Sequence, residues 1–462
     1  MDSGGGNSGK QFDEMPPCSS DQESLRRRSV AVMDSGCERS GVMLDEMPQT
    51  RSRSEFDAGV SLWAGLLPDI LGVVLRFFPC LADRARLRSV CRQWRVGVQG
   101  CLHVLPPPLP ILVLPEFKFS SLSEKGELMP VRCVSVPKEV AADDLRCVGS
   151  FDGWLVGVTP SKKRNDKYYR DADGECFLVN AFSRKVIHLP PLSNSHYDYD
   201  AYSRKSLRVI NGCSEVHFGA NDVYTMSLCQ VVLSASPDPG SKYIVVASSY
   251  HKGAPVLALW QPGMTLWHVC SGVDIDGLKD LAFYQGKLYV LLRHRTRLFS
   301  CELEEDDRGF IVSRIECCLT ELPHNDPYQE GGAISCNMVV WRGELLVIIR
   351  HYIDDFRNRQ LLKVQVFALD VNTNPYGLSE IHSISGDCIF VGSGGCKSFP
   401  ASLHGVEGDL IYFVPDDWKP HDRFVYSMRD GRMRPFAAQL LACYFDMPEE
   451  NLDFPVWLLP SQ

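Results

Sequence analysis

Arg146-Cys147-Val148-Gly149-Ser150-Phe151-Asp152-Gly153-Trp154-Leu155-Val156-Gly157-Val158 is the stretch that decides the fold of most of this chain. Two apolar runs, 146–151 and 154–158, flank the pair Asp152-Gly153. Glycine at the second turn position supplies the positive φ that a tight hairpin needs. The stretch therefore predicts an antiparallel β-hairpin.

The same unit of apolar run, x-Gly turn and apolar run recurs downstream. The further copies are 281–292 around Gln285-Gly286, 337–349 around Arg342-Gly343, 401–414 around Glu407-Gly408, and more loosely 231–247 around Asp238-Pro239-Gly240. Each copy is followed by two more short apolar runs, as at 177–181 with 186–189 and at 256–260 with 266–269. Four strands in each unit is the composition of a propeller blade.

The expected fold of residues 109–460 is thus an all-β propeller, kelch-like, with about five to seven blades. Five units are visible, and residues 109–140 or 440–458 could complete a sixth. The spacing of the turn glycines brackets the kelch period of about 50 residues. A β-sandwich or a row of separate sheets is the alternative, which we consider weaker because similar units repeat.

A short segment before this region has helical periodicity instead. Apolar residues Leu67, Leu71, Val74 and Phe78 fall at i, i+4, i+7 and i+11, on one side of a helix. Pro68 suits the first helical position, and Pro79 ends the pattern.

A second helical pattern follows, with Asp83 as the expected N-cap and glycines 97 and 100 marking its end. Its apolar positions are Leu87, Val90, Cys91, Trp94 and Val98. Residues 61–103 are therefore expected to form a small all-α module, which is too short to bury a large core and would gain stability from a partner.

The two helical patterns together resemble an F-box. The resemblance rests on the Leu67-Pro68 opening with its apolar helix, and on the ending Val90-Cys91-Arg92-Gln93-Trp94. Ile70 stands where many F-boxes carry an acidic residue, and Asp69 directly follows the proline. The resemblance implies docking to a Skp-type adaptor and through it to a cullin. The residues implied in adaptor binding are Leu67, Pro68, Ile70, Leu71, Val74, Leu87, Val90, Cys91 and Trp94.

Charge agrees with an acidic partner for this module. Residues 61–103 hold six arginines and two aspartates, in a chain whose formal net charge is −9. Complementary charge steers association and sets register. The alternative is that these helices only cap the domain that follows.

The whole layout resembles a plant family in which an F-box precedes the domain of unknown function 295, a β-propeller-like region of the KIB type. The supporting residues are Cys147-Val148-Gly149-Ser150 with Gly153-Trp154-Leu155, Leu189-Pro190-Pro191-Leu192, Phe390-Val391-Gly392, Ile411-Tyr412-Phe413 and Val456-Trp457-Leu458-Leu459-Pro460. The resemblance implies the substrate receptor of a ubiquitin ligase, with the propeller as the reader of an unknown protein substrate.

Residues 1–55 are expected to be a disordered tail, because they are rich in Gly, Ser and charge and nearly lack aromatic residues. The tail contains a duplication with an offset of 32 residues. Met1-Asp2-Ser3-Gly4 recurs as Met33-Asp34-Ser35-Gly36, and Asp13-Glu14-Met15-Pro16 recurs as Asp45-Glu46-Met47-Pro48.

Several other chemistries are not favoured by the sequence. Gly392-Ser393-Gly394-Gly395-Cys396-Lys397-Ser398 lacks the glycine that must precede the lysine of a phosphate loop. No paired Cys-x-x-Cys predicts zinc, and no nucleophile motif predicts an enzyme. The basic run 293–297 reads as a solvated loop. We therefore expect no cofactor, no metal, no catalytic residue, no nucleic acid and no membrane partner.

The predicted function is that of the substrate-recognition subunit of an SCF-type (Skp–cullin–F-box) E3 ubiquitin ligase. Residues 61–103 would hold the adaptor, and residues 109–460 would hold a protein substrate. The absence of a visible secretory signal predicts a location in the cytoplasm, the nucleus or both. Two alternatives remain: a protein-interaction scaffold unconnected to ubiquitin, and a propeller enzyme.

Overall fold

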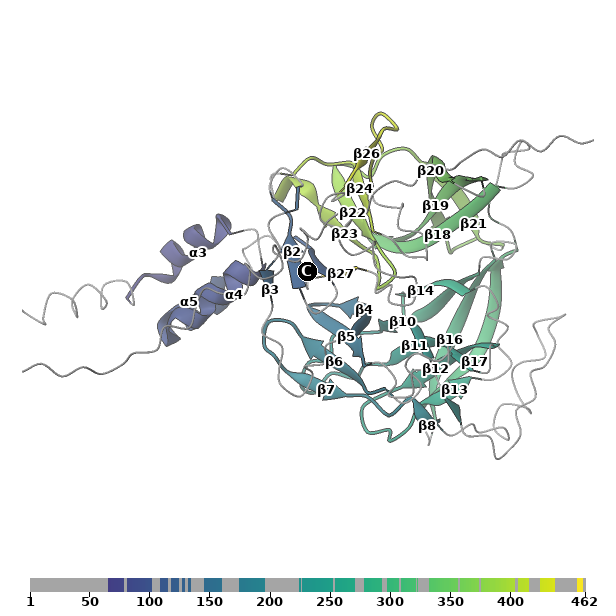
Figure 1. Cartoon of the computed structure of the whole chain (residues 1–462), viewed down its shortest axis with the longest axis horizontal. Coiled ribbons are helices and arrows are strands. Elements are labelled where there is room, and N and C mark those ends of the chain that lie inside the picture. Colours follow the sequence, from purple (N-terminus) through teal and green to yellow (C-terminus); the bar gives the residue numbers. More distant parts are fainter. Residues whose placement is uncertain are drawn as a thin grey trace, which may run out of the picture. The chain divides into compact units, whose positions relative to one another are not determined.

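The computed structural model of this chain places two regions, a set of helices and a larger β region (Figure 1). Residues 61–462 form one compact unit; the other unit, residues 1–60, lies outside the described residues together with the predicted tail. The described residues are 65–78, 81–101, 109–114, 118–123, 127–128, 132–133, 145–159, 174–195, 224–225, 227–251, 254–270, 278–292, 297–306, 309–320, 322, 332–355, 358–373, 375–403, 406–414, 424–436 and 455–459.

The helical region contains three helices, where the sequence showed two apolar patterns. Its helices are α3 (Pro68–Arg76), α4 (Leu81–Val90) and α5 (Arg92–Cys101). The pattern read as a single second helix is divided at Cys91, and Gly97 and Gly100 lie inside α5 instead of ending it. The prediction that Asp83 caps this helix is wrong, because Asp83 is the third residue of α4, where its carboxylate pairs with Arg86.

The β region contains six sheets of four or five strands within the described residues, and we number these sheets as blades. In order across each sheet, their strands are as follows. Blade 1 has β27 (Val456–Leu458), β1 (Ile111–Leu114), β2 (Lys118–Ser121) and β3 (Arg132–Cys133); blade 2 has β4 (Arg146–Phe151), β5 (Trp154–Val158), β6 (Cys176–Asn180) and β7 (Val186–His188); blade 3 has β10 (Ser227–Leu233), β11 (Val245–His251), β12 (Ala254–Trp260) and β13 (His268–Cys270).

Blade 4 has β14 (Leu278–Tyr284), β15 (Lys287–Leu292), β16 (Leu298–Asp306) and β17 (Gly309–Leu319); blade 5 has β18 (Gly332–Trp341), β19 (Glu344–Asp355), β20 (Asn358–Asp370) and β21 (Gly377–Ile381); blade 6 has β23 (Lys397–Pro400), β22 (Asp387–Val391), β24 (Leu410–Phe413), β25 (Phe424–Ser427) and β26 (Met433–Pro435), with the 3-10 helix η4 (Ala401–Leu403). The short strands β8 (Ser193–Ser195) and β9 (Tyr224–Thr225) pair separately.

The hydrophobic core shows that the six blades form a closed ring. Six large apolar clusters each lie between two consecutive blades, and one of them joins blade 6 to blade 1. Alternation along the strands produces this arrangement. On β15, for example, Leu288 and Val290 belong to the cluster shared with blade 3, whereas Tyr289 and Leu291 belong to the cluster shared with blade 5. The predicted β-propeller is confirmed, with six blades, and the sandwich alternative is wrong.

Four of the five predicted hairpins occupy the predicted positions, since 231–247 pairs as β10 with β11, and three of the four have the expected two-residue turn. Asp152, Gln285 and Arg342 have φ of 45°, 47° and 48°, and the glycines that follow them have φ of 83°, 77° and 82°. Two consecutive positive φ values define the type I′ turn, whose twist matches that of paired strands. These turns lie at the same end of blades 2, 4 and 5, which we call the turn face of the propeller.

Blade 1 combines both segments that were considered for a sixth blade. The carboxyl-terminal strand β27 pairs with β1, with Leu112 opposite Trp457. The Trp457 side chain is buried, and its indole N–H donates to the Val391 carbonyl oxygen of blade 6 at 3.2 Å. The end of the chain thus closes the ring by joining its first and last blades.

The predicted hairpin at 401–414 is wrong. Residues 401–403 form η4, and β24 pairs in parallel with β22 instead of with a strand at 401–406. The turn glycine expected at 408 has another role. A Cβ at Gly408 would lie 2.3 Å from the carbonyl oxygen of Gly386, so Gly408 permits a close approach of two backbone segments.

Candidate protein-binding site

Helix α3 begins where the sequence predicts, at Pro68. The proline occupies the first helical position, and Asp69 follows in the first turn, where a carboxylate is favourable for the helix dipole. Leu67 precedes the helix as its N-cap residue and makes no side-chain capping bond. Leu67 therefore contributes an exposed apolar side chain at the entrance of α3 and no cap.

Helices α3 and α5 pack closely because a glycine lies at their contact. A Cβ at Gly97 would lie 2.8 Å from Leu71 Cδ1. The Cys101 thiol, from the end of α5, donates to the Pro68 carbonyl oxygen at 3.2 Å. Leu75 and Val98 are fully buried between these helices. The module thus has a small core, which uses the side of α3 that carries Leu71 and Leu75.

The opposite side of α3 is also apolar, and it is exposed. The exposed fractions are 64% for Leu67, 45% for Ile70, 55% for Val73 and 76% for Phe77. Their spacing places them on one side of the helix. We call these four residues the exposed stripe. Grouped apolar surface of this kind typically marks a protein interaction site.

The nine residues predicted to bind an adaptor are distributed over three environments. Leu67, Pro68, Ile70 and Val90 are exposed; Val74, Leu87, Cys91 and Trp94 are half-buried; Leu71 is 1% exposed. The placement of Leu71 at the interface needs correction, because its side chain already lies against Gly97 in the module core. Leu71 can support an interface only by holding α3 in place.

Sequence reasoning missed three exposed apolar residues of this module, Val73, Phe77 and Val96. The sequence did carry a signal for two of them, because α3 has more apolar residues than are needed to bury one side of a helix. The apolar positions predicted from the sequence included Leu71, which is buried, and Phe78, which is half-buried. That set of positions lies between the buried side of α3 and its exposed side.

The division between α4 and α5 is made by Cys91 itself. The Cys91 Sγ accepts the Trp94 N–H at 3.3 Å, and its carbonyl oxygen accepts the Arg95 N–H at 3.0 Å. The thiol therefore serves as the N-cap of α5, a role usually taken by Ser, Thr, Asp or Asn. This explains how one continuous apolar pattern becomes two helices.

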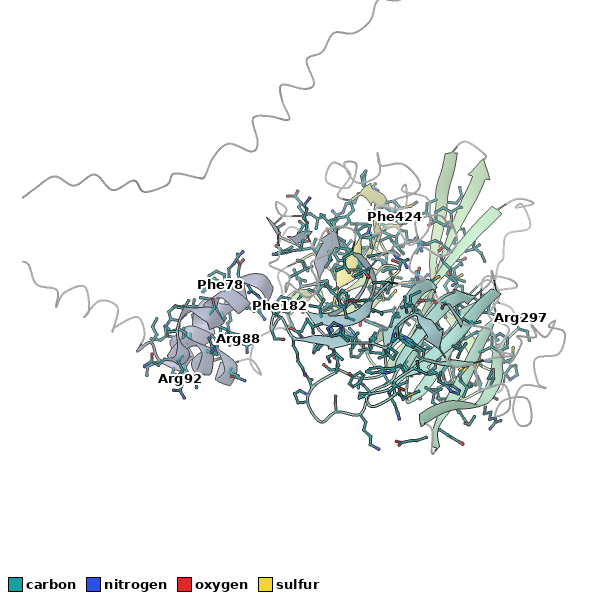
Figure 2. All side chains as sticks on the ribbon, turned by 60° about the horizontal axis from the view of Figure 1, so that its bottom comes forward. Phe78, Arg88, Arg92, Phe182, Arg297 and Phe424 are labelled. Carbon is teal, nitrogen blue, oxygen red and sulfur yellow. The ribbon has the colours of Figure 1, made fainter. Side chains whose placement is uncertain are left out.

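Arginine side chains add positive charge to the surface of the module. Arg76, Arg86, Arg92 and Arg95 are exposed, while Arg84 is buried and donates from Nε to the Phe78 carbonyl oxygen at 2.7 Å. Figure 2 labels Arg88 and Arg92 on these helices. The described surface thus combines an apolar stripe with cationic side chains, which suits a partner with an apolar groove and acidic surroundings.

A buried carboxylate links three blades of the propeller. Asp280 of β14 accepts the Gln230 side-chain amide N–H of blade 3 at 2.7 Å and the Met338 backbone N–H of blade 5 at 2.6 Å. It also accepts the backbone N–H of the next residue, Leu281, at 2.9 Å. Burial raises the pKa of Asp280 from 3.8 to about 6 despite these hydrogen bonds. Because three donors occupy its two oxygens, we interpret Asp280 as a structural link between blades.

The remaining candidate chemistries find no support in their surroundings. The glycine-rich segment 392–398 runs from the end of β22 into β23, so a strand follows it where a phosphate loop requires a helix. Its lysine, Lys397, pairs with Asp152 at 2.9 Å. Within the described ranges, no three His, Cys, Asp or Glu side chains gather to hold a metal ion. Of the basic run, residues 293–296 lie outside the described residues.

No helix in the described part of the chain is both long and apolar enough to cross a membrane.

The fold and the site define a six-bladed β-propeller protein with a small helical module that presents an apolar stripe. The model of the KIB1-4 beta-propeller family matches residues 119–427, about two thirds of the chain. This chain belongs to the KIB1-4 beta-propeller family.

Relatives from Arabidopsis thaliana agree with this assignment. An F-box/kelch-repeat protein is 22% identical over 377 residues, which cover 80% of this chain and 88% of the relative. A putative F-box protein is 29% identical over 136 residues, 29% of this chain and 30% of that protein. The matches confirm the resemblance to plant F-box proteins with a β-propeller.

Solved structures resemble the chain only distantly. A bifunctional GH43-CE protein of Bacteroides eggerthii is 10% identical with a TM-score of 0.28, over 61% of this chain and 30% of that one.

Proposed function

We propose that this chain is the substrate-recognition subunit of an SCF-type ubiquitin ligase. The helical module would bind a Skp-type adaptor, and through it a cullin, while the propeller would hold a protein substrate. The observation that carries the proposal is the exposed stripe of Leu67, Ile70, Val73 and Phe77, which lies on the side of α3 opposite the module core. The membership of the family and the two Arabidopsis relatives support it.

The proposed mechanism is proximity, in which the chain would position the substrate and leave the chemistry to other subunits. A rigid ring of blades would hold the substrate, and the helical module would join that ring to the enzyme complex. Holding two molecules together raises their effective concentration and converts an encounter into an intramolecular step. The transfer of ubiquitin to substrate lysines would take place on other subunits. The proposal includes a cytoplasmic or nuclear location, which imaging of the tagged full chain tests.

A pull-down of the full chain with a purified Skp-type adaptor tests the proposal. The variant Ile70→Ser/Val73→Ser/Phe77→Ser removes most of the exposed stripe and leaves the buried side of α3 unchanged. The matched control, Ile353→Ser/Leu403→Ser/Met433→Ser, removes three exposed apolar side chains from the propeller.

We expect the wild type and the control to retain the adaptor and the stripe variant to lose it. Circular dichroism of each protein checks that its fold is intact. Failure of the folded wild type to bind the adaptor, or equal binding by all three proteins, would contradict the proposal. The scaffold alternative would then replace it.

A further inference from the structure

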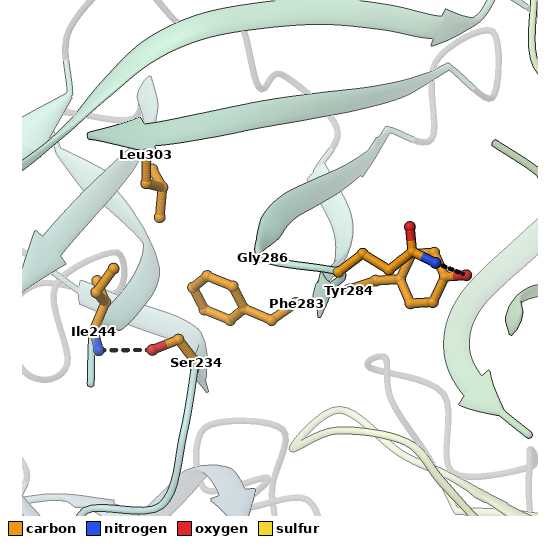
Figure 3. A pocket seen from close by; sticks show the side chains of 7 residues that line it. Ser234, Ile244, Phe283, Tyr284, Gly286 and Leu303 are labelled. Atoms are coloured by element: carbon orange, nitrogen blue, oxygen red, sulfur yellow. Dashed lines mark hydrogen bonds between the residues drawn. The ribbon is translucent and has the colours of Figure 1, made fainter. Parts of the chain in front are cut away.

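A pocket opens between blades 3 and 4 at the turn face of the propeller (Figure 3). Its apolar walls are Ile244 of blade 3 with Phe283 and Leu303 of blade 4. Figure 3 shows the Phe283 ring pointing into the space between Leu303 and Ile244, whereas Tyr284 points the other way. Two different blades therefore form the opposite walls of one cavity.

The size of the pocket limits what it can hold. Its volume is about 230 Å³. Pockets for small molecules and cofactors commonly measure about 300–1,000 Å³. A cavity below that range, lined by one aromatic and two aliphatic side chains, suits one apolar amino-acid side chain better than a cofactor.

Polar groups at the margin of the pocket suit an extended peptide backbone. The Ser234 hydroxyl accepts the Ile244 N–H at 2.8 Å, and no described residue accepts its own proton. The Gln285 amide nitrogen donates to the Tyr284 hydroxyl at 2.9 Å, which in turn donates to the Gly343 carbonyl oxygen of blade 5 at 2.8 Å. The Gln285 amide is thus turned toward blade 5, and the Ser234 hydroxyl is the polar group that can pair with a peptide C=O.

Charge next to the pocket is mixed, with a small excess of carboxylates. Lys287, directly after the lining residue Gly286, pairs with Glu302 at 2.8 Å, and Glu304 and Glu305 of β16 directly follow the lining residue Leu303. Glu305 pairs with Lys242 of blade 3 at 3.3 Å, and both side chains are at least half exposed. An exposed pair of this kind is weak, so a cation from a ligand can replace Lys242 at little cost. The excess of carboxylates on β16 therefore favours a basic ligand.

We propose that this pocket recognises a basic segment of the protein substrate, by taking one apolar side chain flanked by Lys or Arg. The inference rests on the proposed function, since a substrate receptor must hold a protein chain. The apolar side chain enters between Phe283, Leu303 and Ile244, and the flanking cations meet the carboxylates at the end of β16. The segment binds in an extended form over the turn Gln285-Gly286.

A fluorescent library of random twelve-residue peptides, screened against the full chain, tests this inference. Two variants change the pocket: Leu303→Trp fills it, and Glu305→Lys reverses a charge beside it. Each has a matched control elsewhere, Leu403→Trp at an exposed leucine of η4 and Glu175→Lys at an exposed position before β6. Adaptor retention is measured on the same preparations.

We expect the binding peptides to be enriched in an apolar residue flanked by Lys or Arg. Leu303→Trp weakens these peptides roughly ten- to a hundredfold, the equivalent of one buried apolar side chain. Glu305→Lys weakens them roughly two- to fivefold and reduces the salt dependence, as reversal of an exposed charge does. Both controls bind like the wild type.

Three results would overturn the inference: no binding peptides, binders without this composition, or binders that Leu303→Trp leaves unaffected. Adaptor retention separates these outcomes from failure of the proposed function. A chain that retains the adaptor but shows no pocket-dependent peptides contradicts the pocket alone. A chain that fails to retain the adaptor contradicts the ligase function, whatever the peptides show.

Discussion

The buried carboxylate of Asp280 predicts an unusual dependence of propeller stability on pH. Burial raises its pKa from 3.8 to about 6, so between these values the folded protein binds more protons at this site than the unfolded chain. The free energy of unfolding contributed by Asp280 therefore rises as the pH falls through 6, is fully present below about pH 4, and is lost as the pH rises again.

The size of this effect follows from the shift. A rise of the pKa from 3.8 to about 6 corresponds to about 3 kcal/mol. Asp280→Asn removes the titration and leaves one amide nitrogen opposite the Gln230 or Met338 donor, because the carboxylate accepts from both. The unsatisfied contact costs about 1–3 kcal/mol. The variant should therefore be least stable relative to the wild type near pH 4. Near pH 7 its stability should approach or exceed that of the wild type.

Urea unfolding of the full chain between pH 4 and pH 7, followed by tryptophan fluorescence, measures this difference. Other carboxylates titrate in the same range. The comparison is therefore the free energy of unfolding of the wild type minus that of the variant, at each pH. Glu175→Gln, which removes an exposed carboxylate, is the control and should follow the wild type. A difference between wild type and Asp280→Asn that stays constant with pH would refute the reasoning.

Two further predictions concern closure of the ring and the backbone of blade 6. Trp457→Ala should lower the free energy of unfolding by about 3–5 kcal/mol, because the ring is 1% exposed between blades 1 and 6; Trp457→Phe, which keeps most of the packing, should cost less, and equal costs would contradict the packing argument. Gly408→Ala should destabilise the protein by about 2 kcal/mol, because its Cβ would meet the Gly386 carbonyl oxygen; thermal unfolding measures the loss, and an unchanged midpoint would contradict the close approach.

The repeated hairpins could be predicted because their information is local. At 146–158 two apolar runs and an Asp-Gly turn specify both strands, and the structure pairs Phe151 with Trp154 across that turn. The number of blades was less accessible. Blade 1 takes its strands from both ends of the chain, and no local pattern indicates that 111–114 pairs with 456–458.

Blade 6 shows where the same reasoning fails. Glu407-Gly408 between apolar runs looks like the other turns, yet the strand beside β24 is β22, which pairs with it in parallel. Parallel pairing needs a long connection and leaves no turn signal between the paired strands. Gly408 is required by contact with Gly386, a residue that is distant in sequence.

The helical module was predicted in type and position, but the two sides of α3 were not separated. The apolar face of α3 is so wide that its periodicity does not show which part of that face is buried. Gly97 decides the matter, because it lets α5 approach Leu71 and leaves Phe77 exposed. The orientation of α3 therefore depends on packing between helices.

The affinity of a purified Skp-type adaptor for the full chain, compared between Phe77→Ser and Leu403→Ser, tests the central claim most directly. Phe77 is 76% exposed on α3 and Leu403 is 53% exposed on the propeller, so neither change disturbs a core. Burial of a phenylalanine side chain in a partner is worth about 1.5–3 kcal/mol, or roughly a ten- to hundredfold change in Kd. The account predicts that loss for Phe77→Ser and an unchanged Kd for Leu403→Ser. Equal affinities for the two variants would contradict it.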